Sequence, residues 1–191
     1  MITGLKLRVL GAIKLLLKPL VGEYSAYLVY RSPDQDEPVL AQFTVRALQA
    51  SDVDSSTDEV VRRQASYLGP QSLGFVCMEG EQALGLCFYW FGERYRQRNY
   101  WPLQEDEAKL VQIVTVARAQ GRGVATTLIR QSLASVHQAG FRCAFARVWH
   151  SNVGSYKAFE RAGWRRIAFV AEIHPLGRAT PWRFVRHFPP G

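Results

Sequence analysis

Apolar residues recur along the chain with two different spacings, and these spacings predict an alternation of strands and helices. Short alternating or continuous apolar runs are typical of strands, whereas apolar residues three or four positions apart are typical of helices. Polar breaks containing glycine, proline or aspartate separate the runs. The pattern predicts strands at residues 23–32, 39–48, 109–116, 141–150, 164–173 and 182–188, a β-hairpin at 73–92, and helices at 58–68, 123–138 and 153–162.

The order of these elements predicts one α/β domain of the α+β kind. In the main part of the chain a strand, a helix and a hairpin are followed by a strand, a helix, a strand and a helix, and then by two closing strands. This order favours a mixed, largely antiparallel sheet flanked by helices. We place the domain at residues 39–191, because the polar, proline-bounded stretch SPDQDEP at 32–38 is the best candidate for a boundary.

Residues 1–38 are interpreted as an appendage made of a basic, apolar helix and a strand. The helical stretch at residues 5–18 is too short and too charged to span a bilayer. No small-x-small cleavage site follows it, so we expect a cytoplasmic protein. Its apolar residues lie nearly all round the helix, which favours packing on its own domain or on a second subunit of a homodimer. The alternative is a peripheral contact with a membrane surface.

Composition and charge restrict the classes of partner without choosing among them. The chain has 191 residues, of which 48% are hydrophobic and 21% charged, and this suits a globular domain. A net charge of +8 favours a polyanionic partner, which can be nucleic acid, an anionic membrane face or a phosphate-rich cofactor. Cys77, Cys87 and Cys143 form no C-x-x-C pair and have no histidines at metal-ligand spacing, so we expect no metal site.

The stretch QGRGVA, residues 120–125, lies between the apolar run LVQIVTV and a predicted helix. A glycine turn at a helix start exposes backbone N–H groups and the positive end of the helix dipole, and together these favour an anion such as phosphate. The glycines have the wrong spacing for a dinucleotide-binding G-x-G-x-x-G turn and come too late in the chain. A nucleotide-binding P-loop would require G-K-[ST], which is absent from the sequence.

The stretch at 120–125 resembles the pyrophosphate-binding signature Q/R-x-x-G-x-G/A of the Gcn5-related N-acetyltransferase (GNAT) superfamily. Further along, NVGSYKAFERAGW resembles the second signature of that family, N-x-x-A-x-x-L-Y-x-x-x-G-F, with Asn152, Gly163 and Trp164 in register. The resemblance covers residues 42–188. It implies a GNAT-type sheet, acetyl-CoA as the acyl donor, and transfer of the acetyl group to a primary amine.

For the cofactor, the resemblance implies that the glycine turn wraps the pyrophosphate of coenzyme A and that the preceding strand pairs with the pantetheine amides. That strand is expected to part from the strand at 141–150 and so open a slot for the thioester. A backbone N–H near Val116 would stabilise the oxyanion, and Asn152 would cap its helix. The implied cofactor-binding residues are Val114, Thr115, Val116, Gln120, Gly121, Arg122, Gly123, Val124, Ala125, Asn152, Ser155 and Phe159.

For catalysis, the resemblance implies direct attack of the amine on the thioester while both substrates are bound. In this family a tyrosine often protonates the leaving thiolate, but Phe159 occupies that position here. Tyr156 is therefore our candidate acid, with Ser155 or a water as substitutes. His150 and Glu107 are candidates for the general base because they flank the presumed slot. The alternatives are a packing role for Tyr156 and ordinary surface positions for the other two.

The acceptor is expected to be a small metabolite or an amino sugar, because the long aromatic connection at 93–108 suits a cover for a small molecule. Glu93, Glu105 and Asp106 would make the approach acidic, which suits a cationic amine. Phe159 leaves open a non-catalytic acyl-CoA-binding module, and the net charge leaves open a protein of membrane or nucleic-acid surfaces. The sequence contains no recognised nucleic-acid module, so no nucleic-acid partner is expected.

Overall fold

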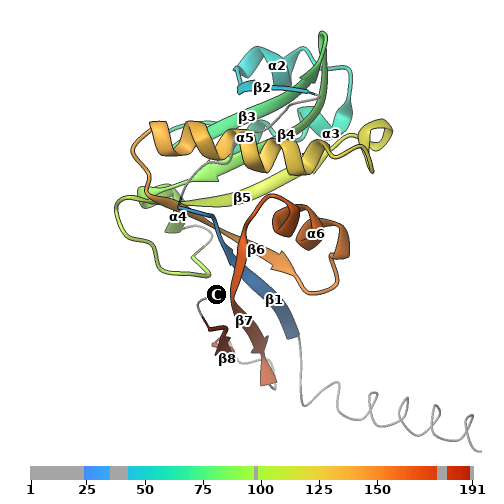
Figure 1. The fold of residues 1–191 in the computed structure, drawn as a ribbon. Coiled ribbons are helices and arrows are strands. Elements are labelled where there is room, and N and C mark those ends of the chain that lie inside the picture. Colours follow the sequence, from blue (N-terminus) through green and yellow to red (C-terminus); the bar gives the residue numbers. More distant parts are fainter. Residues whose placement is uncertain (1–23, 35–42, 97–98, 176–179, 190–191) are drawn as a thin grey trace, which may run out of the picture.

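A computed structural model describes residues 24–34, 43–96, 99–175 and 180–189, and the predicted helix at 5–18 lies outside these residues. Within them, eight strands form one sheet in the order β2-β3-β4-β5-β6-β1-β7-β8 (Figure 1). The strands are β1 Tyr24–Arg31, β2 Thr44–Ala47, β3 Ser72–Glu79, β4 Gln82–Trp90, β5 Glu107–Thr115, β6 Cys143–Trp149, β7 Arg165–Ile173 and β8 Trp182–His187. The helices are α2 Ala50–Asp54, α3 Glu59–Arg62, α4 Gly92–Tyr95, α5 Val124–Gln138 and α6 Val153–Arg161, with 3₁₀ turns η1 Ala65–Tyr67 and η3 Ala117–Ala119.

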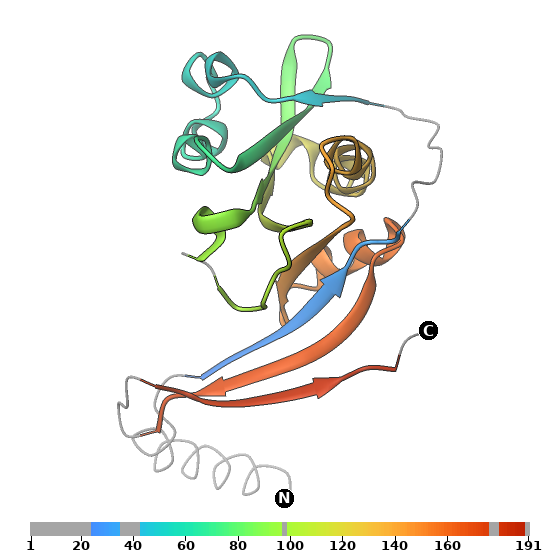
Figure 2. The ribbon, with the colours of Figure 1, turned by 90° about the vertical axis from the view of Figure 1, so that its left-hand side faces the viewer.

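The sheet is mixed, as the sequence predicts. Neighbouring strands run antiparallel everywhere except at β5 and β6, which are parallel. Helix α5 packs on the half of the sheet that contains β3, β4 and β5, and its apolar face forms the larger core with residues such as Leu128, Ile129 and Leu133. Figure 2 shows that β1, β7 and β8 curve away from this half. A second, smaller core, around Tyr27, Tyr100 and Phe145, lies on the opposite face of the sheet, since β1 and β6 contribute alternate residues to the two cores.

Elements marked by strong local signals form where the sequence predicts them. The hairpin of β3 and β4 turns at Glu79–Gln82, and Gly80 adopts a φ of +58° there, which glycine tolerates without steric cost. Helix α5 begins directly after Gly123 and α6 directly after Asn152, whose side chain accepts a hydrogen bond from the backbone N–H of Ser155 at 3.0 Å. Asn152 is therefore the N-cap that the sequence predicts.

Elements with weaker signals differ from the prediction. Of the strand expected at 39–48, residues 43–48 are described, and Thr44–Ala47 of these form a strand. The helix expected at 58–68 divides into α3 and the 3₁₀ turn η1. Helix α2, which the sequence pattern did not predict, begins after Gln49, whose backbone N–H donates a hydrogen bond to the Asp52 side chain at 2.8 Å. Single-turn helices of this kind carry too few residues for a periodic signal.

The division of the chain at residue 38 is corrected by the position of β1. This strand does not belong to an appendage: it lies inside the sheet, antiparallel to β6 on one side and to β7 on the other. Tyr27, Val29 and Tyr30 are completely buried. The proline-bounded stretch at 32–38 is a local break in the chain, and a local break does not reveal which distant strands pair. Among the described residues, no helix has the length and apolar character needed to cross a bilayer.

Candidate active site

A slot opens in the middle of the sheet because β5 and β6 pair over only four residues. Their parallel register runs from Glu107 beside Cys143 to Leu110 beside Ala146 and then stops. At the same place β5 carries one extra residue relative to β4, since Leu110 faces Tyr89 but Gln112 faces Phe88. An extra residue of this kind bends a strand and ends its pairing. This confirms the expectation that the two strands part.

The backbone of β5 beyond this bulge presents unpaired groups to the slot. The N–H of Val116 donates to the carbonyl oxygen of Leu84 at 3.0 Å, so it is committed to β4 and is not available as the oxyanion donor that the sequence suggested. Successive N–H groups of an antiparallel strand point to opposite sides. The N–H groups of Ile113 and Thr115 therefore point away from β4, toward the slot.

At one end of the slot the glycine turn and the start of α5 form a cavity of about 490 Å³, which we call the glycine-turn cavity. Gly121 and Gly123 have φ angles of +77° and +85°, and a Cβ added to either would meet no protein atom within 4 Å. The first N–H groups of a helix have no partner within the helix. The turn thus leaves an open cradle of backbone donors at the positive end of a 15-residue helix. The cavity is lined by Ile113, Thr115, Ala119, Gln120, Gly121, Gly123, Val124, Ala125, Thr126, Asn152, Gly154, Ser155, Lys157, Ala158 and Arg161.

The charges at this cavity differ from those predicted. Arg122 does not line it: its guanidinium pairs with Glu79 at 2.5 Å and lies over the ring of Phe43. Lys157 and Arg161, both on α6, line the cavity instead. The sequence motif could not indicate them, because they come from a different helix that only the fold brings opposite the glycine turn. Val114, also predicted to bind the cofactor, pairs with Leu86 of β4 and is not among the lining residues.

At the other end of the slot lies a smaller cavity of about 170 Å³, which we call the aromatic cavity. Three of its residues, Ile113, Asn152 and Ser155, also line the glycine-turn cavity, so the two are parts of one opening. Phe159 lines this end and is held in place by stacking on Tyr30 and by an edge contact with Trp164. The aromatic cavity is lined by Tyr100, Leu110, Val111, Gln112, Ile113, Arg147, Val148, Trp149, Asn152, Ser155 and Phe159.

The three predicted catalytic side chains do not meet in this opening. Tyr156 packs against the larger core with Arg166 over its ring, and lines neither cavity. Ser155 lies one helical turn before Phe159 on the same face of α6, and it lines both cavities. His150 is exposed, and its Nδ1 lies 3.1 Å from the carbonyl oxygen of Ala26.

Glu107 is also outside the opening. Its carboxylate pairs with Arg142 at 2.7 Å and accepts a hydrogen bond from the backbone N–H of Gln104 at 3.0 Å. It lies in the part of β5 that is still paired with β6, before the slot begins. These contacts hold the ends of the two strands together, which is a structural role.

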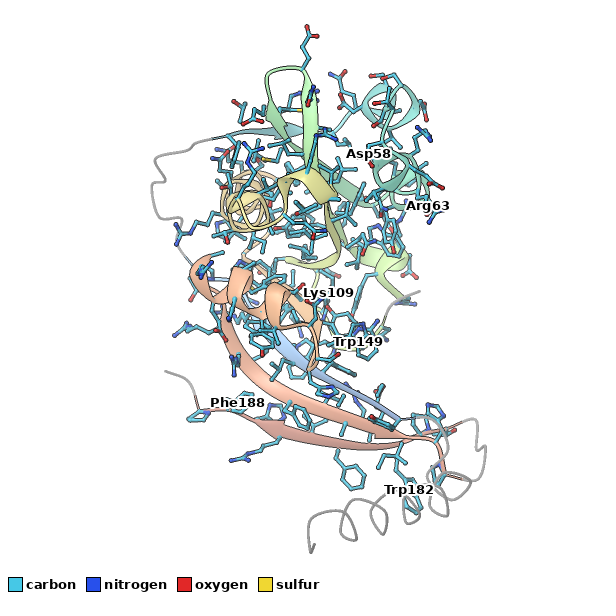
Figure 3. All side chains as sticks on the ribbon, turned by 90° about the vertical axis from the view of Figure 1, so that its right-hand side faces the viewer. Asp58, Arg63, Lys109, Trp149, Trp182 and Phe188 are labelled. Atoms are coloured by element: carbon cyan, nitrogen blue, oxygen red, sulfur yellow. The ribbon has the colours of Figure 1, made fainter. Side chains whose placement is uncertain are left out.

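A buried lysine beside the aromatic cavity was not indicated by the sequence pattern. Lys109 is completely buried, and its Nζ has no hydrogen-bond partner among the described residues. Burial, which excludes water from the ammonium, lowers the pKa of Lys109 to about 6, and the Glu107 carboxylate opposes this shift. Figure 3 labels Lys109 and Trp149 where the two halves of the sheet meet. Four rings surround the Nζ at 4.2 to 5.9 Å from their centroids: Tyr95, Tyr100, Trp101 and Phe145.

Several lining residues were missed, and only one of them had a usable signal. Tyr100 belongs to the connection at 93–108, which the sequence marks as long, aromatic and suited to cover a site. Arg147 and Trp149 lie within an ordinary apolar strand pattern, and nothing local distinguishes them. Within the described residues, no group of three or more histidine, cysteine, aspartate or glutamate side chains is arranged to hold a metal ion.

Comparison with known proteins identifies the relatives of the chain. The sequence model of the acetyltransferase (GNAT) family matches residues 39–164. A GNAT-family protein from Novosphingobium aromaticivorans is similar in structure, with a TM-score of 0.59 and 16% identity over 80% of this chain and 65% of that chain. An acetyltransferase of the GNAT family from Colwellia psychrerythraea gives a TM-score of 0.57 and 12% identity over 85% and 60%.

The ribosomal-protein-S18-alanine N-acetyltransferase of Escherichia coli gives a TM-score of 0.51 and 17% identity over 68% of this chain and 81% of that chain. No curated protein sequence matches the chain. At these identities the structural likeness concerns the fold alone. The chain also spans slightly less than two thirds of the lengths of the Novosphingobium and Colwellia chains.

Proposed function

Because this chain belongs to the GNAT acetyltransferase family, we propose that it transfers an acetyl group from acetyl-CoA to the primary amine of a small metabolite. The observation that carries the proposal is the continuous opening between β5 and β6. A cradle of backbone N–H donors lies at one of its ends and an aromatic cavity at the other, and Ile113, Asn152 and Ser155 are shared by both. An extended thioester with a pyrophosphate at one end matches this shape and polarity.

The residues present suit coenzyme A at the glycine-turn cavity. Backbone N–H groups at the start of α5 would bind the pyrophosphate, and Gly121 and Gly123 would let its oxygens approach the backbone. Lys157 and Arg161 would add positive charge. The separated edge of β5 would pair with the pantetheine amides as an added strand does.

In the proposed mechanism the neutral amine attacks the carbonyl carbon of the thioester in the ternary complex. One of the two N–H groups on the separated edge of β5, that of Ile113 or that of Thr115, would donate to the developing oxyanion. The carbon–sulfur bond then breaks, and coenzyme A leaves as the thiolate while the proton of the amine passes to water. Ser155 would donate a hydrogen bond to the departing sulfur. A serine hydroxyl is a weak acid, so it stabilises the thiolate and does not protonate it.

A pair of substitutions on α6 tests this assignment. We expect Ser155→Ala to lower kcat by about tenfold, the worth of one hydrogen bond to a charged group, with little change in the affinity for acetyl-CoA. Tyr156→Phe, which removes a hydroxyl from the next residue, should leave kcat within about twofold. Steady-state rates of coenzyme A release with saturating acetyl-CoA provide the measurement. A larger loss of kcat in Tyr156→Phe than in Ser155→Ala would instead support Tyr156 as the general acid.

The first experiment is a calorimetric titration of the full chain with acetyl-CoA, free coenzyme A and a control oligonucleotide. Micromolar binding of acetyl-CoA supports the proposed function. Binding of the oligonucleotide alone would instead favour a protein that uses its +8 charge on nucleic acid.

A cytoplasmic location, a homodimer and a membrane contact through residues 5–18 stay predictions. Deletion of residues 5–18, followed by vesicle binding and sedimentation, tests the last two.

A further inference from the structure

Among the residues that the structure describes, one charged side chain lines the aromatic cavity, and it is positive. This described lining includes no aspartate or glutamate, and Arg147 is its sole ionic side chain. The acidic approach that the sequence suggested does not form there. Glu93 pairs with Arg96, and Asp106 pairs with Arg142, which lies beside the paired ends of β5 and β6.

Arg147 is held by rings and has no acidic partner in the described part of the chain. Its guanidinium carbon lies 4.8 Å from the ring centroids of Tyr100 and Trp149 and 5.4 Å from that of Tyr27. Stacking of this kind orients the guanidinium plane and leaves its N–H donors available.

The acidic residue that lies on the same face of the sheet as Arg147 already has hydrogen-bond and ionic partners. Glu172 of β7 accepts hydrogen bonds from Ser25 and Tyr27, and it pairs with Arg183 of β8 at 3.4 Å. The same Arg183 donates to the carbonyl oxygen of Tyr100. Glu172 is thus used in holding β1, β8 and the connection before β5 together, and the positive charge of Arg147 is left for a ligand.

A second, independent feature of the cavity also requires a hydrogen-bond partner. Tyr100 is 7% exposed and lines the aromatic cavity, and its hydroxyl has no hydrogen-bond partner among the described residues. Burial raises the pKa of Tyr100 well above 10, so the hydroxyl stays protonated and can donate. A buried polar group without a partner is costly, and a ligand oxygen would remove that cost once the hydroxyl, which is closed to solvent in this conformation, turns toward the cavity.

From these two features we propose that the aromatic cavity recognises a carboxylate through Arg147 and Tyr100. The acceptor is then a small amine that also carries a carboxylate, as amino acids do. The inference rests on the proposed function and narrows its acceptor class. A guanidinium and a hydroxyl donor suit a carboxylate, whereas the same guanidinium would repel a polycationic amino sugar. A cavity of about 170 Å³ suits a ligand of this size.

The test compares amines with and without a carboxylate. Transfer from acetyl-CoA is measured for ω-amino acids and for the corresponding carboxamides, and binding of the same compounds is measured by calorimetry with free coenzyme A present. We expect the acids to be favoured by at least about tenfold. Arg147→Gln should remove this preference, Arg147→Lys should keep part of it, and Tyr100→Phe should reduce it. Arg63→Gln is the matched control, because Arg63 is exposed and paired with Glu59.

A second arm tests whether the carboxylate belongs to the acyl group instead. Succinyl-CoA carries a carboxylate beyond the thioester, and its affinity is compared with that of acetyl-CoA in the same variants. A selective loss of succinyl-CoA binding in Arg147→Gln would support carboxylate recognition and assign it to the acyl donor. Absence of a carboxylate preference in both arms, with acetyl-CoA bound normally, would overturn this inference alone. Absence of acetyl-CoA binding would overturn the proposed function as well.

Discussion

Replacing Gly123 with alanine is expected to weaken acetyl-CoA binding by at least about tenfold, or 1.4 kcal/mol. The reason is steric and local. A Cβ at this position meets no protein atom within 4 Å, so the space it would fill is the cradle in which the phosphates are proposed to lie. Calorimetric titration of the variant with acetyl-CoA measures the loss.

The control for this prediction is Gly140→Ala, at the other end of the same helix. Gly140 has a φ of +95° and equally open surroundings, so both variants carry the backbone strain of about 1–2 kcal/mol that a side chain meets in the left-handed region. Gly140 does not line the opening. Both variants should lose similar thermal stability, but Gly140→Ala should bind acetyl-CoA as the wild type does. Unchanged affinity in a folded Gly123→Ala protein would contradict the phosphate assignment.

Lys109→Met is expected to stabilise the protein, on the order of a few kcal/mol at pH 6. Lys109 is completely buried and its Nζ has no hydrogen-bond partner in the described residues, so the native state either keeps a charge out of water or gives up its proton. Methionine has a similar length and suits the surrounding rings without that cost. Urea denaturation of the two proteins measures the difference.

The sign of the pH dependence of folding stability follows from the lowered pKa of Lys109. The amine titrates near pH 6 in the folded protein and near 10.5 in the unfolded chain. Between these values the unfolded chain binds a proton that the native state lacks, so wild-type stability rises with pH by up to about 1.4 kcal/mol per unit. The advantage of Lys109→Met should therefore be largest at pH 6 and below, and should shrink as the pH approaches 10.5.

Lys157→Met serves as the control, because Lys157 is exposed on α6. The stability difference between Lys157→Met and the wild type should not follow the pH dependence expected for Lys109→Met. The four rings around Lys109 attract a cation, and if they hold the ammonium charged throughout, the stability difference between Lys109→Met and the wild type will not change with pH. That result would contradict the lowered pKa.

The elements that could be predicted from the sequence are those whose signal is contained in a few consecutive residues. The β3–β4 hairpin, α5 and α6 are of this kind, since periodicity, turn glycines and an asparagine cap act locally. The glycine turn was likewise predicted as an anion site, because backbone donors at a helix start require no distant partner. The matching family model agrees with the fold that these signals indicated.

The sequence by itself determined the order of the main elements, the glycine turn at the start of α5 and the cap of α6. Tertiary structure alone decided that β1 lies between β6 and β7, that Arg122 pairs with Glu79, and that Arg147, Trp149 and Tyr100 gather at one cavity. These contacts join residues far apart in the chain, and their energy depends on which strands pair and where β5 leaves β6. No local pattern contains that information, so the carboxylate recognition that we propose could be inferred only from the fold.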